Sequence, residues 1–399
     1  MTARIDIGIA GAGVAGLAAA ALLARAGHRV TVADRFETPM PVGSGLVIQP
    51  VGLAVLDRMG AGDAARALGN PIHRMRGHEA DSGRQVLDVH YRLKGRDFFG
   101  LAIHRAALFD CLWQAARTAG VALRPGAEVR AAPPGGTGRW LETVAGRLGP
   151  FDLVLDCSGA RSTLSPLVAR PLPYGAIWGT VPWPGPGGTD LSPTELTQCY
   201  RKASRMAGVL PLGRLPGDPT PLAAIFWSMP RPALAGWAAC DPVAWKAEAG
   251  ALWPGYAPFL ETITEAGQML PASYGHGTLR RPVGDRIAYL GDAAHRASPQ
   301  LGQGANMALL DALALVLALE AAEGAEALAL YARMRRWHVR LYQTFSVLFT
   351  PQYQSDSLLL PVLRDRGLMP LSRLWPLPRV LNRLVCGDLI PPLAGVAFP

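Results

Sequence analysis

Two glycine-containing segments, each accompanied by an acidic residue, are the parts of this sequence best suited to chemistry. The first reads Gly11-x-Gly13-x-x-Gly16 and stands between an apolar run and an Ala/Leu-rich run. Glycines at this spacing permit a tight turn, close approach of the backbone to a pyrophosphate, and close packing of the following helix, whose free N–H groups attract phosphate. Asp34 follows 34 − 11 = 23 residues later, where a carboxylate can accept both hydroxyls of an adenosine ribose. This segment predicts a dinucleotide site and does not distinguish NAD from FAD.

The second segment lies near residue 300. Gly291-Asp292 ends a strand-like run, and the turn Pro299-Gln-Leu-Gly-Gln-Gly-Ala-Asn306 leads into a helical run that carries Asp311. A glycine-rich turn entering a helix directs backbone N–H groups and a partial positive charge at whatever lies in front of it. His295, between the two parts, is as well explained by a core or capping role as by a functional one.

These segments resemble fingerprints of the class A flavoprotein monooxygenases, the para-hydroxybenzoate hydroxylase-like group that includes ubiquinone-pathway and quinolone hydroxylases. The resemblance covers residues 5–35, 150–165 and 286–312. It implies that Asp292 binds a ribityl hydroxyl of FAD. The turn at 299–306 would lie against the isoalloxazine ring, with its N–H groups facing flavin N1 and the C2 carbonyl, where negative charge collects on reduction.

Two further positions complete the expected FAD site. Arg105 resembles the family arginine that reaches the ribityl-pyrophosphate region, although a solvent-facing arginine is the alternative, and Gly45 could approach the flavin closely. The expected cofactor-binding residues are Gly11, Gly13, Ala15, Gly16, Asp34, Arg35, Gly45, Arg105, Gly291, Asp292, Pro299, Gly302, Gly304, Ala305 and Asn306.

The resemblance also implies an activity. NADH or NADPH would reduce FAD, dioxygen would add at flavin C4a, and the terminal hydroperoxide oxygen would pass to an electron-rich carbon of a hydrophobic aromatic or heteroaromatic substrate. The protein must supply a dry pocket for this chemistry. Candidate pocket residues are Trp178, Tyr200, Phe226 and Trp227, although aromatic residues more often fill the core of a sheet. No general base and no metal ligand set can be assigned.

The middle fingerprint departs from the family pattern. The family usually ends this strand in Asp-Gly, whereas this chain reads Asp156-Cys-Ser158-Gly159. The substitution puts the mode of reduction by NAD(P)H in doubt and also resembles flavin-dependent tryptophan halogenases, whose Trp-x-Trp-x-Ile-Pro signature is absent here. Three hypotheses therefore stand: a single-component FAD monooxygenase, a halogenase or other two-component flavoenzyme, and a flavin-binding protein without oxygenase activity.

The elements that must position these residues follow from periodicity. A strand over 5–10, a helix over 17–26 and a strand over 28–34 form a right-handed crossover unit, which predicts a doubly wound parallel α/β fold. Helices over 50–59 and 105–119 and strands over 121–124 and 150–157 extend it. We expect a discontinuous FAD-binding domain (1–75, 98–170, 280–320), an inserted, mainly antiparallel substrate domain (76–97, 171–279) and a C-terminal helical cap (321–399) with breaks at its prolines.

Composition limits the partners. Net charge is 39 − 30 = +9, carried mostly by scattered arginine without a dense basic run, so we predict no nucleic-acid partner. Five widely spaced cysteines and the lack of a leader pattern indicate a cytoplasmic protein. The apolar run 307–322 contains Asp311 and Glu320 and predicts a buried helix.

The C-terminal region resembles that of ubiquinone-like and quinolone-like hydroxylases and is expected to cover the pocket. Its arginines beside many leucines leave a peripheral membrane contact open, with a packed cap as the simpler interpretation. The chain is expected to be a monomer or homodimer.

Overall fold

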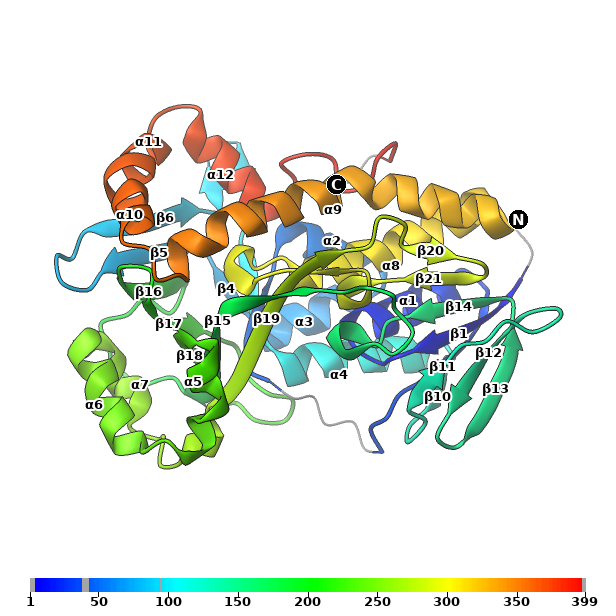
Figure 1. Ribbon diagram of the computed structural model, residues 1–399, viewed down its shortest axis with the longest axis horizontal. Helices are drawn as coiled ribbons and strands as arrows, with labels where there is room; N and C mark the ends of the chain where they lie inside the picture. Colours follow the sequence, from blue (N-terminus) through cyan, green and yellow to red (C-terminus); the bar gives the residue numbers. More distant parts are fainter. Residues whose placement is uncertain (1–3, 38–42, 94, 397–399) are drawn as a thin grey trace.

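The computed structural model describes residues 4–37, 43–93 and 95–396, which form two large sheets and a long C-terminal helical region (Figure 1). The first sheet has the strand order β10-β2-β1-β14-β21-β20. Neighbouring strands are parallel except β20, which runs antiparallel to β21. The strands are β1 (Asp6–Ala10), β2 (Arg29–Ala33), β10 (Ala122–Arg124), β14 (Leu153–Asp156), β20 (Val283–Gly284) and β21 (Ile287–Tyr289). The predicted parallel α/β fold is confirmed.

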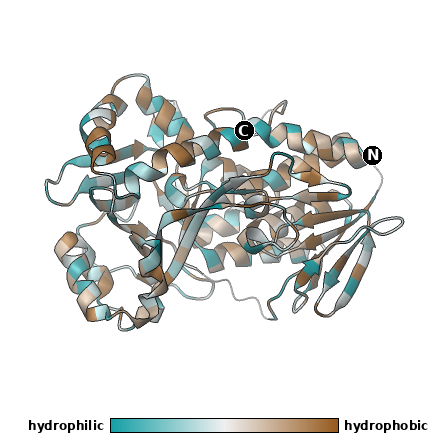
Figure 2. Ribbon diagram, viewed as in Figure 1, coloured by the Kyte–Doolittle hydropathy of each residue, from teal (hydrophilic) through white to brown (hydrophobic). Residues whose placement is uncertain are grey.

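Apolar helices cover this sheet. α1 (Val14–Arg25) packs against α4 (Arg105–Thr118) and α8 (Gly304–Ala321), and its alanine-rich sequence lets the neighbouring backbones approach closely. By length and composition α8 is the one described helix that could cross a membrane. Because 72% of that helix is buried inside the molecule, it is the core helix that the sequence predicts. α1 and α8 are largely apolar and buried, and the first sheet and its helices are mostly brown in Figure 2.

The second large sheet has the order β22-β19-β15-β18-β17-β16-β5-β6. All neighbours are antiparallel except β16 and β5, which confirms the predicted antiparallel architecture. Its strands are β5 (Arg74–Glu79), β6 (Gln85–His90), β15 (Arg170–Pro182), β16 (Glu195–Arg201), β17 (Arg205–Pro211), β18 (Leu222–Pro230), β19 (Leu270–Thr278) and β22 (His295–Arg296).

The sequence did not predict the helices inserted between β18 and β19. They are α5 (Arg231–Ala235), α6 (Pro242–Leu252) and α7 (Ala257–Leu260). They bury one face of the second sheet, where Ile177, Ile225 and Trp227 pack with Trp237 and Trp245. Short helices separated by proline and tryptophan lack the long 3.6-residue periodicity that identifies a helix in a sequence.

Smaller sheets accompany the two large ones. β3 (Gly45–Ile48), β9 (Gly100–His104) and β4 (Asn70–Ile72) form one, and β9 leads directly into α4. The remaining short elements are β7 (Arg92–Leu93), β8 (Arg96–Asp97), β11 (Val129–Ala131), β12 (Arg139–Thr143), β13 (Gly146–Phe151), α2 (Pro50–Arg58) and α3 (Gly62–Leu68). The predicted helices at 50–59 and 105–119 are confirmed.

The C-terminal region is helical as predicted. α9 (Gly324–Tyr353) runs along the top of the molecule in Figure 1, followed by α10 (Leu359–Leu363), a π-helical turn (Arg364–Leu368), α11 (Met369–Ser372) and α12 (Leu377–Cys386). The prolines were expected to interrupt helices, and Pro376 and Pro378 do stand at the break between α11 and α12, in positions where a residue without an N–H is tolerated. Pro351 and Pro361, in contrast, lie inside α9 and α10, and Pro370 lies in the first turn of α11.

Candidate functional site

The Gly11–Gly16 turn connects β1 to α1. Gly11 has a φ of +99°, and a Cβ there would lie 2.5 Å from the Cys157 carbonyl oxygen, while a Cβ on Gly16 would lie 1.9 Å from the carbonyl oxygen of Gly11. A Cβ on Gly13 would meet no protein atom within 4 Å, and no side chain caps α1. The turn is therefore closed toward the protein and presents free N–H groups on its outer side, as a phosphate site requires.

Asp34 lies beside this turn. Its Oδ2 accepts a hydrogen bond from the Ala12 N–H at 2.6 Å, and its Oδ1 accepts one from the Phe36 N–H at 3.3 Å. The side chain is only partly buried, so its oxygens keep lone pairs for ribose hydroxyls. Arg35 next to it is exposed. The geometry fits the predicted ribose contact, which stays a prediction.

The two glycine-containing segments meet in space. A Cβ on Gly291 would lie 3.4 Å from the Cβ of Ala15 and 3.3 Å from that of Ala308. β14 lies between β1 and β21, so the carboxyl ends of these parallel strands reach the same edge of the sheet. Gly11 follows β1 at this edge and Asp292 follows β21. One ligand can therefore contact both segments.

Asp292 is exposed at the edge of the sheet. Desolvation by the surrounding protein raises the pKa of its carboxyl, against the opposing influence of His295, Arg296 and Arg105. A carboxylate is a strong acceptor for a ligand hydroxyl. Arg105 thus lies close enough to Asp292 to act on it electrostatically.

A buried ionic cluster supports the Gly291–Asp292 turn from behind. Asp311 Oδ2 accepts hydrogen bonds from the Gly291 N–H at 2.9 Å and from His295 Nε2 at 2.6 Å, and Oδ1 accepts one from Arg335 Nε at 2.7 Å. Burial opposes the charged carboxylate, but His295 and Arg335 outweigh it and lower the pKa of Asp311 to about 2. His295 is therefore a buried member of this cluster, the core role that the sequence left open.

The turn before α8 shows the second glycine-rich geometry. Gly302 adopts the left-handed conformation with a φ of +60°, and a Cβ on Gly304 would meet no protein atom within 4 Å. No side chain caps α8, so its first N–H groups remain available. Asn306 serves the turn itself: its Oδ1 accepts from the Gln49 N–H at 2.8 Å and its Nδ2 donates to the Gly302 carbonyl at 3.0 Å. Any contact of Asn306 with FAD would therefore come from its backbone.

Arg105 and the segment before β3 lie together. The Arg105 N–H donates to the Ser44 carbonyl at 3.0 Å, and the Arg105 side chain passes close to Gly43. The Ser44 hydroxyl donates to the Gly179 carbonyl at 2.8 Å. A Cβ on Gly45 would lie only 2.3 Å from a methyl carbon of Leu212, so packing against Leu212 requires glycine at this position. Its predicted approach to the flavin stays a prediction.

Asp156 organises the middle fingerprint. Its Oδ1 accepts hydrogen bonds from the Ser158 N–H at 3.1 Å and hydroxyl at 2.5 Å, and its Oδ2 accepts one from the Ser162 hydroxyl at 2.6 Å. Ser158 therefore replaces a charged family residue with a neutral hydroxyl beside the Gly11 turn.

The four candidate pocket aromatics divide between two faces of the second sheet. Trp178 pairs with Phe226, their ring centroids lie 4.5 Å apart, and Tyr200 lies on the same face. Tyr200 and Phe226 are buried, and Tyr353 and Arg364 cover Tyr200. Trp227 points to the opposite face because side chains alternate along a strand, so it cannot line the same pocket as the other three.

Tyr274, for which the sequence alone established no role, contacts the candidate pocket residue Trp178. Its hydroxyl accepts a hydrogen bond from Trp178 Nε1 at 2.6 Å, and burial raises its pKa to about 12, with Trp178 and Arg105 acting in the opposite direction. Trp178 also lines a cavity of about 340 Å³, together with Gly43, Ser44, His104 and Thr180. Only the register of β19 against β15 brings Tyr274 to Trp178, and no sequence pattern indicates it.

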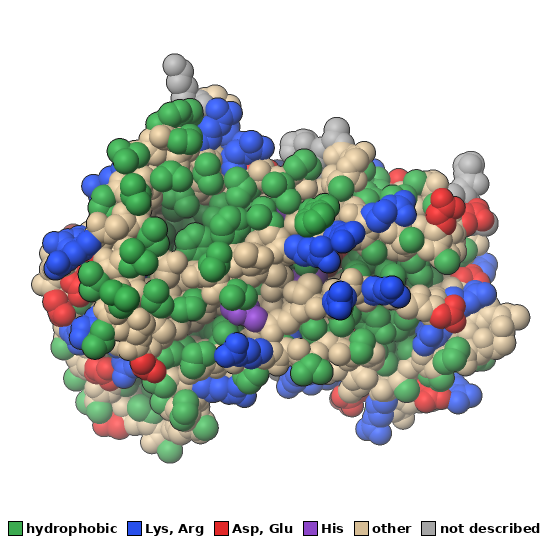
Figure 3. Space-filling view, turned by 45° about the horizontal axis from the view of Figure 1, so that its top comes forward, with side chains coloured by type: hydrophobic (Ala, Val, Ile, Leu, Met, Phe, Trp, Pro, Cys, Tyr) green, Lys and Arg blue, Asp and Glu red, His purple; other side chains and the backbone are tan. Residues whose placement is uncertain are grey.

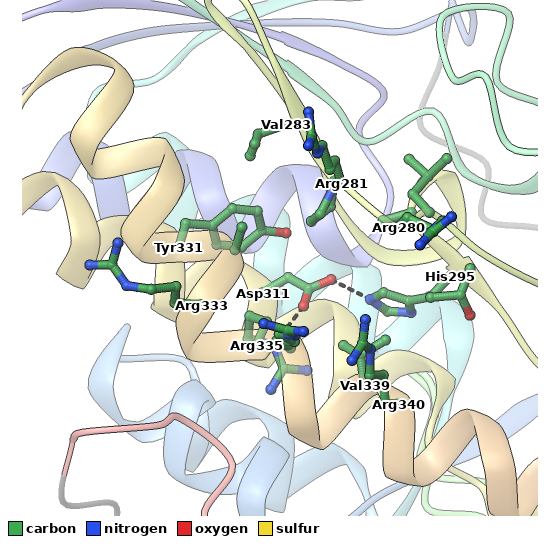
Figure 4. A pocket seen from close by; sticks show the side chains of 16 residues that line it. Arg280, Arg281, Val283, His295, Asp311, Tyr331, Arg333, Arg335, Val339 and Arg340 are labelled. Carbon is green, nitrogen blue, oxygen red and sulfur yellow. Dashed lines mark hydrogen bonds and ion pairs between the residues drawn. The ribbon is translucent and has the colours of Figure 1, made fainter.

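Another cavity has a volume of about 840 Å³ and is lined by none of the residues expected to bind FAD. It lies between the segment that follows β19 and the first half of α9 (Figure 4). Five exposed arginines line it: Arg280, Arg281, Arg333, Arg336 and Arg340. The dashed lines in Figure 4 join Asp311 to His295 and Arg335 at its floor.

The sheet-edge site fits FAD. Glycines leave room where a pyrophosphate would pass, two uncapped helix N-termini face the same edge, and Asp34 and Asp292 stand at separate places along it. A dinucleotide whose two ends contact different strand ends has the length to use both carboxylates. The fold and this site together define a flavoprotein.

Comparisons with known proteins agree. A family model described as "FAD binding domain" matches residues 4–164 and 265–345. The chain is 29% identical over 359 residues to 3-amino-4-hydroxybenzoate 2-monooxygenase of Streptomyces cremeus, covering 83% of each chain. It is 30% identical over 385 residues to a probable 2-heptyl-3-hydroxy-4(1H)-quinolone synthase, AqdB2, of Rhodococcus erythropolis, covering 94% of this chain and 93% of that one.

Solved structures share the fold. Klebsiella pneumoniae HpxO, complexed with FAD and uric acid, superposes with a TM-score of 0.78 at 19% identity over 98% of this chain and 99% of that one. Pseudomonas aeruginosa PqsL, complexed with 2-aminobenzoylacetate, gives a TM-score of 0.75 at 22% identity over 92% of this chain and 100% of that one. The chain belongs to the FAD-binding domain family and is an FAD-dependent monooxygenase.

Proposed function

We propose that this monooxygenase hydroxylates a hydrophobic heteroaromatic or aromatic small molecule, using NADH or NADPH and dioxygen. The observation that carries the proposal is Trp178, which lines a cavity of about 340 Å³ and donates a hydrogen bond to the Tyr274 hydroxyl behind it. The volume is suited to a small aromatic ring system. Relatives named for hydroxybenzoate, urate and quinolone substrates support this substrate class. The net reaction joins one oxygen atom to a substrate carbon and reduces the other to water, with two electrons supplied by the nicotinamide.

Each part of the site has a separate task. Bound FAD would supply the reduction of dioxygen and the delivery of one oxygen atom. The residues proposed to hold it are those of the Gly11–Gly16 turn, Asp34, Arg105 and Asp292, and the N–H groups at the start of α8 would stabilise negative charge on the ring. We keep the division into an FAD-binding domain, a substrate domain and a C-terminal cap as part of this proposal.

Tyr274 is proposed to orient the substrate. Because its oxygen already accepts from Trp178, its own proton is free to be donated to a substrate oxygen or nitrogen. Its high pKa keeps that proton in place at neutral pH. Trp178 would supply the flat apolar wall against which an aromatic ring packs.

Anaerobic mixing with NADH or NADPH tests the proposal. We expect the flavin absorbance near 450 nm to bleach, faster in the presence of a quinolone or hydroxybenzoate, and oxygen to be consumed in step with product when air is admitted. Reduction only by a separate reductase would support a two-component enzyme such as a halogenase. Tight FAD binding without turnover would support a non-oxygenating flavoprotein.

A further inference from the structure

Exposed apolar side chains are concentrated in one part of the surface. Of the 17 large apolar residues that are exposed in the described part of the chain, 11 lie between residues 347 and 377. Leu358, Leu359, Leu374 and Trp375 are 71%, 73%, 60% and 76% exposed. They belong to α10, α11 and their connections, where brown residues reach the outside in Figure 2. We call this set, residues 347–377, the C-terminal apolar face, and a patch of this kind marks an interaction site.

A basic stripe continues this face along α9. Arg333, Arg336, Trp337, Arg340, Val347 and Leu348 are all exposed, and their spacing of three, four and seven residues places them on one side of the helix. The side is basic in its first half and apolar in its second. The guanidinium groups of Arg336 and Arg340 lie 5.2 and 5.3 Å from the ring centroid of Trp337. Figure 3 shows basic and apolar side chains gathered on the same face of the molecule.

Arg280 and Arg281 face this stripe across the 840 Å³ cavity and complete an arginine groove (Arg280, Arg281, Arg333, Arg336 and Arg340; Figure 4). Among the residues that the structure describes, no carboxylate lies within ion-pair distance of these five guanidinium groups. The carboxylate at the floor of the groove, Asp311, is already neutralised by His295 and Arg335. The groove therefore presents uncompensated positive charge to an external anion.

The C-terminal apolar face is almost free of acidic residues. Between residues 344 and 379 the sequence contains only Asp356 and Asp365. Asp356 accepts a hydrogen bond from the Tyr174 hydroxyl at 2.5 Å, and Asp365 is paired with Arg364 at 2.6 Å. Both carboxylates of this surface are therefore bound to neighbouring side chains of the protein, and the surface as a whole is apolar and cationic.

The inner side of the same segment touches the substrate sheet. Tyr353 lies 5.4 Å from Tyr200 between ring centroids, and the guanidinium of Arg364 lies 5.1 Å from each of these rings. Tyr200 belongs to the aromatic cluster that includes Trp178 and Phe226. A ligand bound to the outer side of the C-terminal apolar face would therefore be separated from the proposed substrate site by the thickness of one helix.

A second copy of the chain is a poor occupant for this surface. In a two-fold symmetric contact the same patch faces itself, so the two arginine grooves would approach each other without counter-charges. An anionic bilayer supplies both missing partners. Headgroup phosphates match guanidinium groups, and the acyl boundary accepts Leu and Trp side chains.

We propose that the arginine groove and the C-terminal apolar face together dock the enzyme on an anionic phospholipid bilayer. Phosphate headgroups occupy the groove, and Leu358, Leu359, Leu374 and Trp375 enter the acyl boundary. The docking depends on this surface alone, whereas its use, the transfer of a lipophilic substrate from the bilayer, rests on the proposed function.

Vesicle sedimentation of the FAD-loaded full chain tests the docking. We expect it to sediment with vesicles of phosphatidylcholine mixed with phosphatidylglycerol, weakly with phosphatidylcholine alone, and less at high salt. R333E/R336E/R340E should weaken binding to the anionic vesicles at least about tenfold. L374S/W375S should abolish it at any salt concentration. Flavin absorbance and NAD(P)H oxidation with a water-soluble substrate should not change in either variant, which separates this test from that of the proposed function.

Matched controls distinguish the surface from general properties of the chain. Val168 and Val243 are 92% and 71% exposed outside the face, so V168S/V243S should bind vesicles like the parent. Arg58, Arg130 and Arg231 are exposed outside the groove, and R58E/R130E/R231E should also bind normally. The proposal would be overturned if the parent bound neutral and anionic vesicles equally, or if the control triple variant lost as much binding as R333E/R336E/R340E. It would also be overturned if the parent did not bind vesicles and formed a dimer that L374S/W375S converts to a monomer.

Discussion

The Asp292 carboxylate is accessible to a ligand at the sheet edge, and desolvation by the surrounding protein raises its pKa, against the influence of His295, Arg296 and Arg105. Asp292→Ala should weaken FAD binding by about 1.5 to 3 kcal/mol, the range for hydrogen bonds to charged groups. Titration of the apoprotein with FAD, followed by flavin fluorescence, measures the change. Asp285→Ala, which removes an exposed carboxylate seven residues earlier, is the control and should leave FAD affinity unchanged. Equal FAD affinity in the two variants would contradict the assignment.

Tyr274 supports a second prediction at the residue scale. Tyr274→Phe keeps the ring and removes the proposed substrate hydrogen bond, so kcat/KM should fall about fivefold to tenfold while FAD affinity stays constant. Steady-state kinetics with the identified substrate measures the effect. Tyr256→Phe is the matched control, because its hydroxyl donates to the Phe226 carbonyl at 3.1 Å and belongs to the core on the other face of the sheet. A fall of the same size in the control would assign the loss to the sheet rather than to the substrate.

Residues in the glycine-rich turns could be predicted because their constraint is local. Gly11 and Gly16 are set by the turn they form, and Asp34 by the length of one crossover unit. Tyr274 and Trp227 depend on strand register, which fixes the face on which each side chain lies and leaves no signal in a short segment. The local part of the candidate site was therefore visible in the sequence and the pocket wall was not.

A neutral histidine is one of the side chains that join α9 to the end of α12, beside Tyr342, whose hydroxyl donates to the Leu384 carbonyl at 2.9 Å. His338 Nε2 donates to the Gly387 carbonyl at 2.8 Å, and its Nδ1 accepts from Arg335 at 3.3 Å. Burial, reinforced by the charge of Arg335, lowers its pKa from 6.5 to about 3. Between about pH 6.5 and 3, His338 is therefore protonated in the unfolded chain and neutral in the folded chain. The free energy of unfolding falls as the pH drops through this range, by up to about 1.4 kcal/mol per pH unit.

Urea unfolding at a series of pH values between neutrality and the acid limb measures this dependence. His338→Gln removes the titrating group and should flatten the curve below about pH 6.5. His90→Gln changes an exposed histidine and should retain the parental slope. Parallel curves for the parent and His338→Gln would show that the acid sensitivity originates elsewhere.

The cluster that joins α8 to α9 gives a further prediction. Asp311→Asn leaves Arg335 buried without a counter-charge and should cost about 3 to 5 kcal/mol of unfolding free energy. Asp57→Asn, which breaks the solvent-accessible pair with Arg66, should cost less than about 1 kcal/mol. Urea unfolding at neutral pH compares the two. Because Asp311 also accepts from the Gly291 N–H, its variant should additionally weaken FAD binding, and a stable variant with normal FAD affinity would refute the supporting role.

Long elements were predictable where their periodicity is sustained. α1, α4 and α8 are 12, 14 and 18 residues long and rich in alanine and leucine, and β1, β2 and β14 are short strands of mostly buried residues. α5 to α7 are 4 to 11 residues long and contain proline, so the same test cannot distinguish them from loops.

At the scale of the whole molecule, FAD would connect strand ends that belong to distant parts of the chain. Removing FAD should therefore lower the melting temperature, and saturating FAD at about a hundredfold above its Kd should restore about 2.7 kcal/mol. Thermal unfolding of the apoprotein at increasing FAD concentrations measures this. In Asp292→Ala, a higher FAD concentration should be needed to reach the same rise in melting temperature, while the melting temperature of the apoprotein should stay close to that of the parent. An apoprotein indifferent to FAD would contradict the site.

The general architecture followed from the crossover unit at the N-terminus, but the arginine groove did not. Its two walls come from residues 280–281 and 333–340, and neither contains a dense basic run. Only the packing of α9 beside the end of β19 assembles them. Charge that is scattered in a sequence can thus be concentrated by the fold.

The strand order has a consequence for biosynthesis. β21 is the neighbour of β14 in the first sheet, and β19 and β22 close one side of the second, yet all three are encoded after residue 269. Neither sheet can be completed until about two thirds of the polypeptide has left the ribosome. A nascent chain halted before that point would expose unpaired strand edges, so ribosome-associated chaperones should bind truncated chains ending before residue 270 more strongly than chains ending after residue 322.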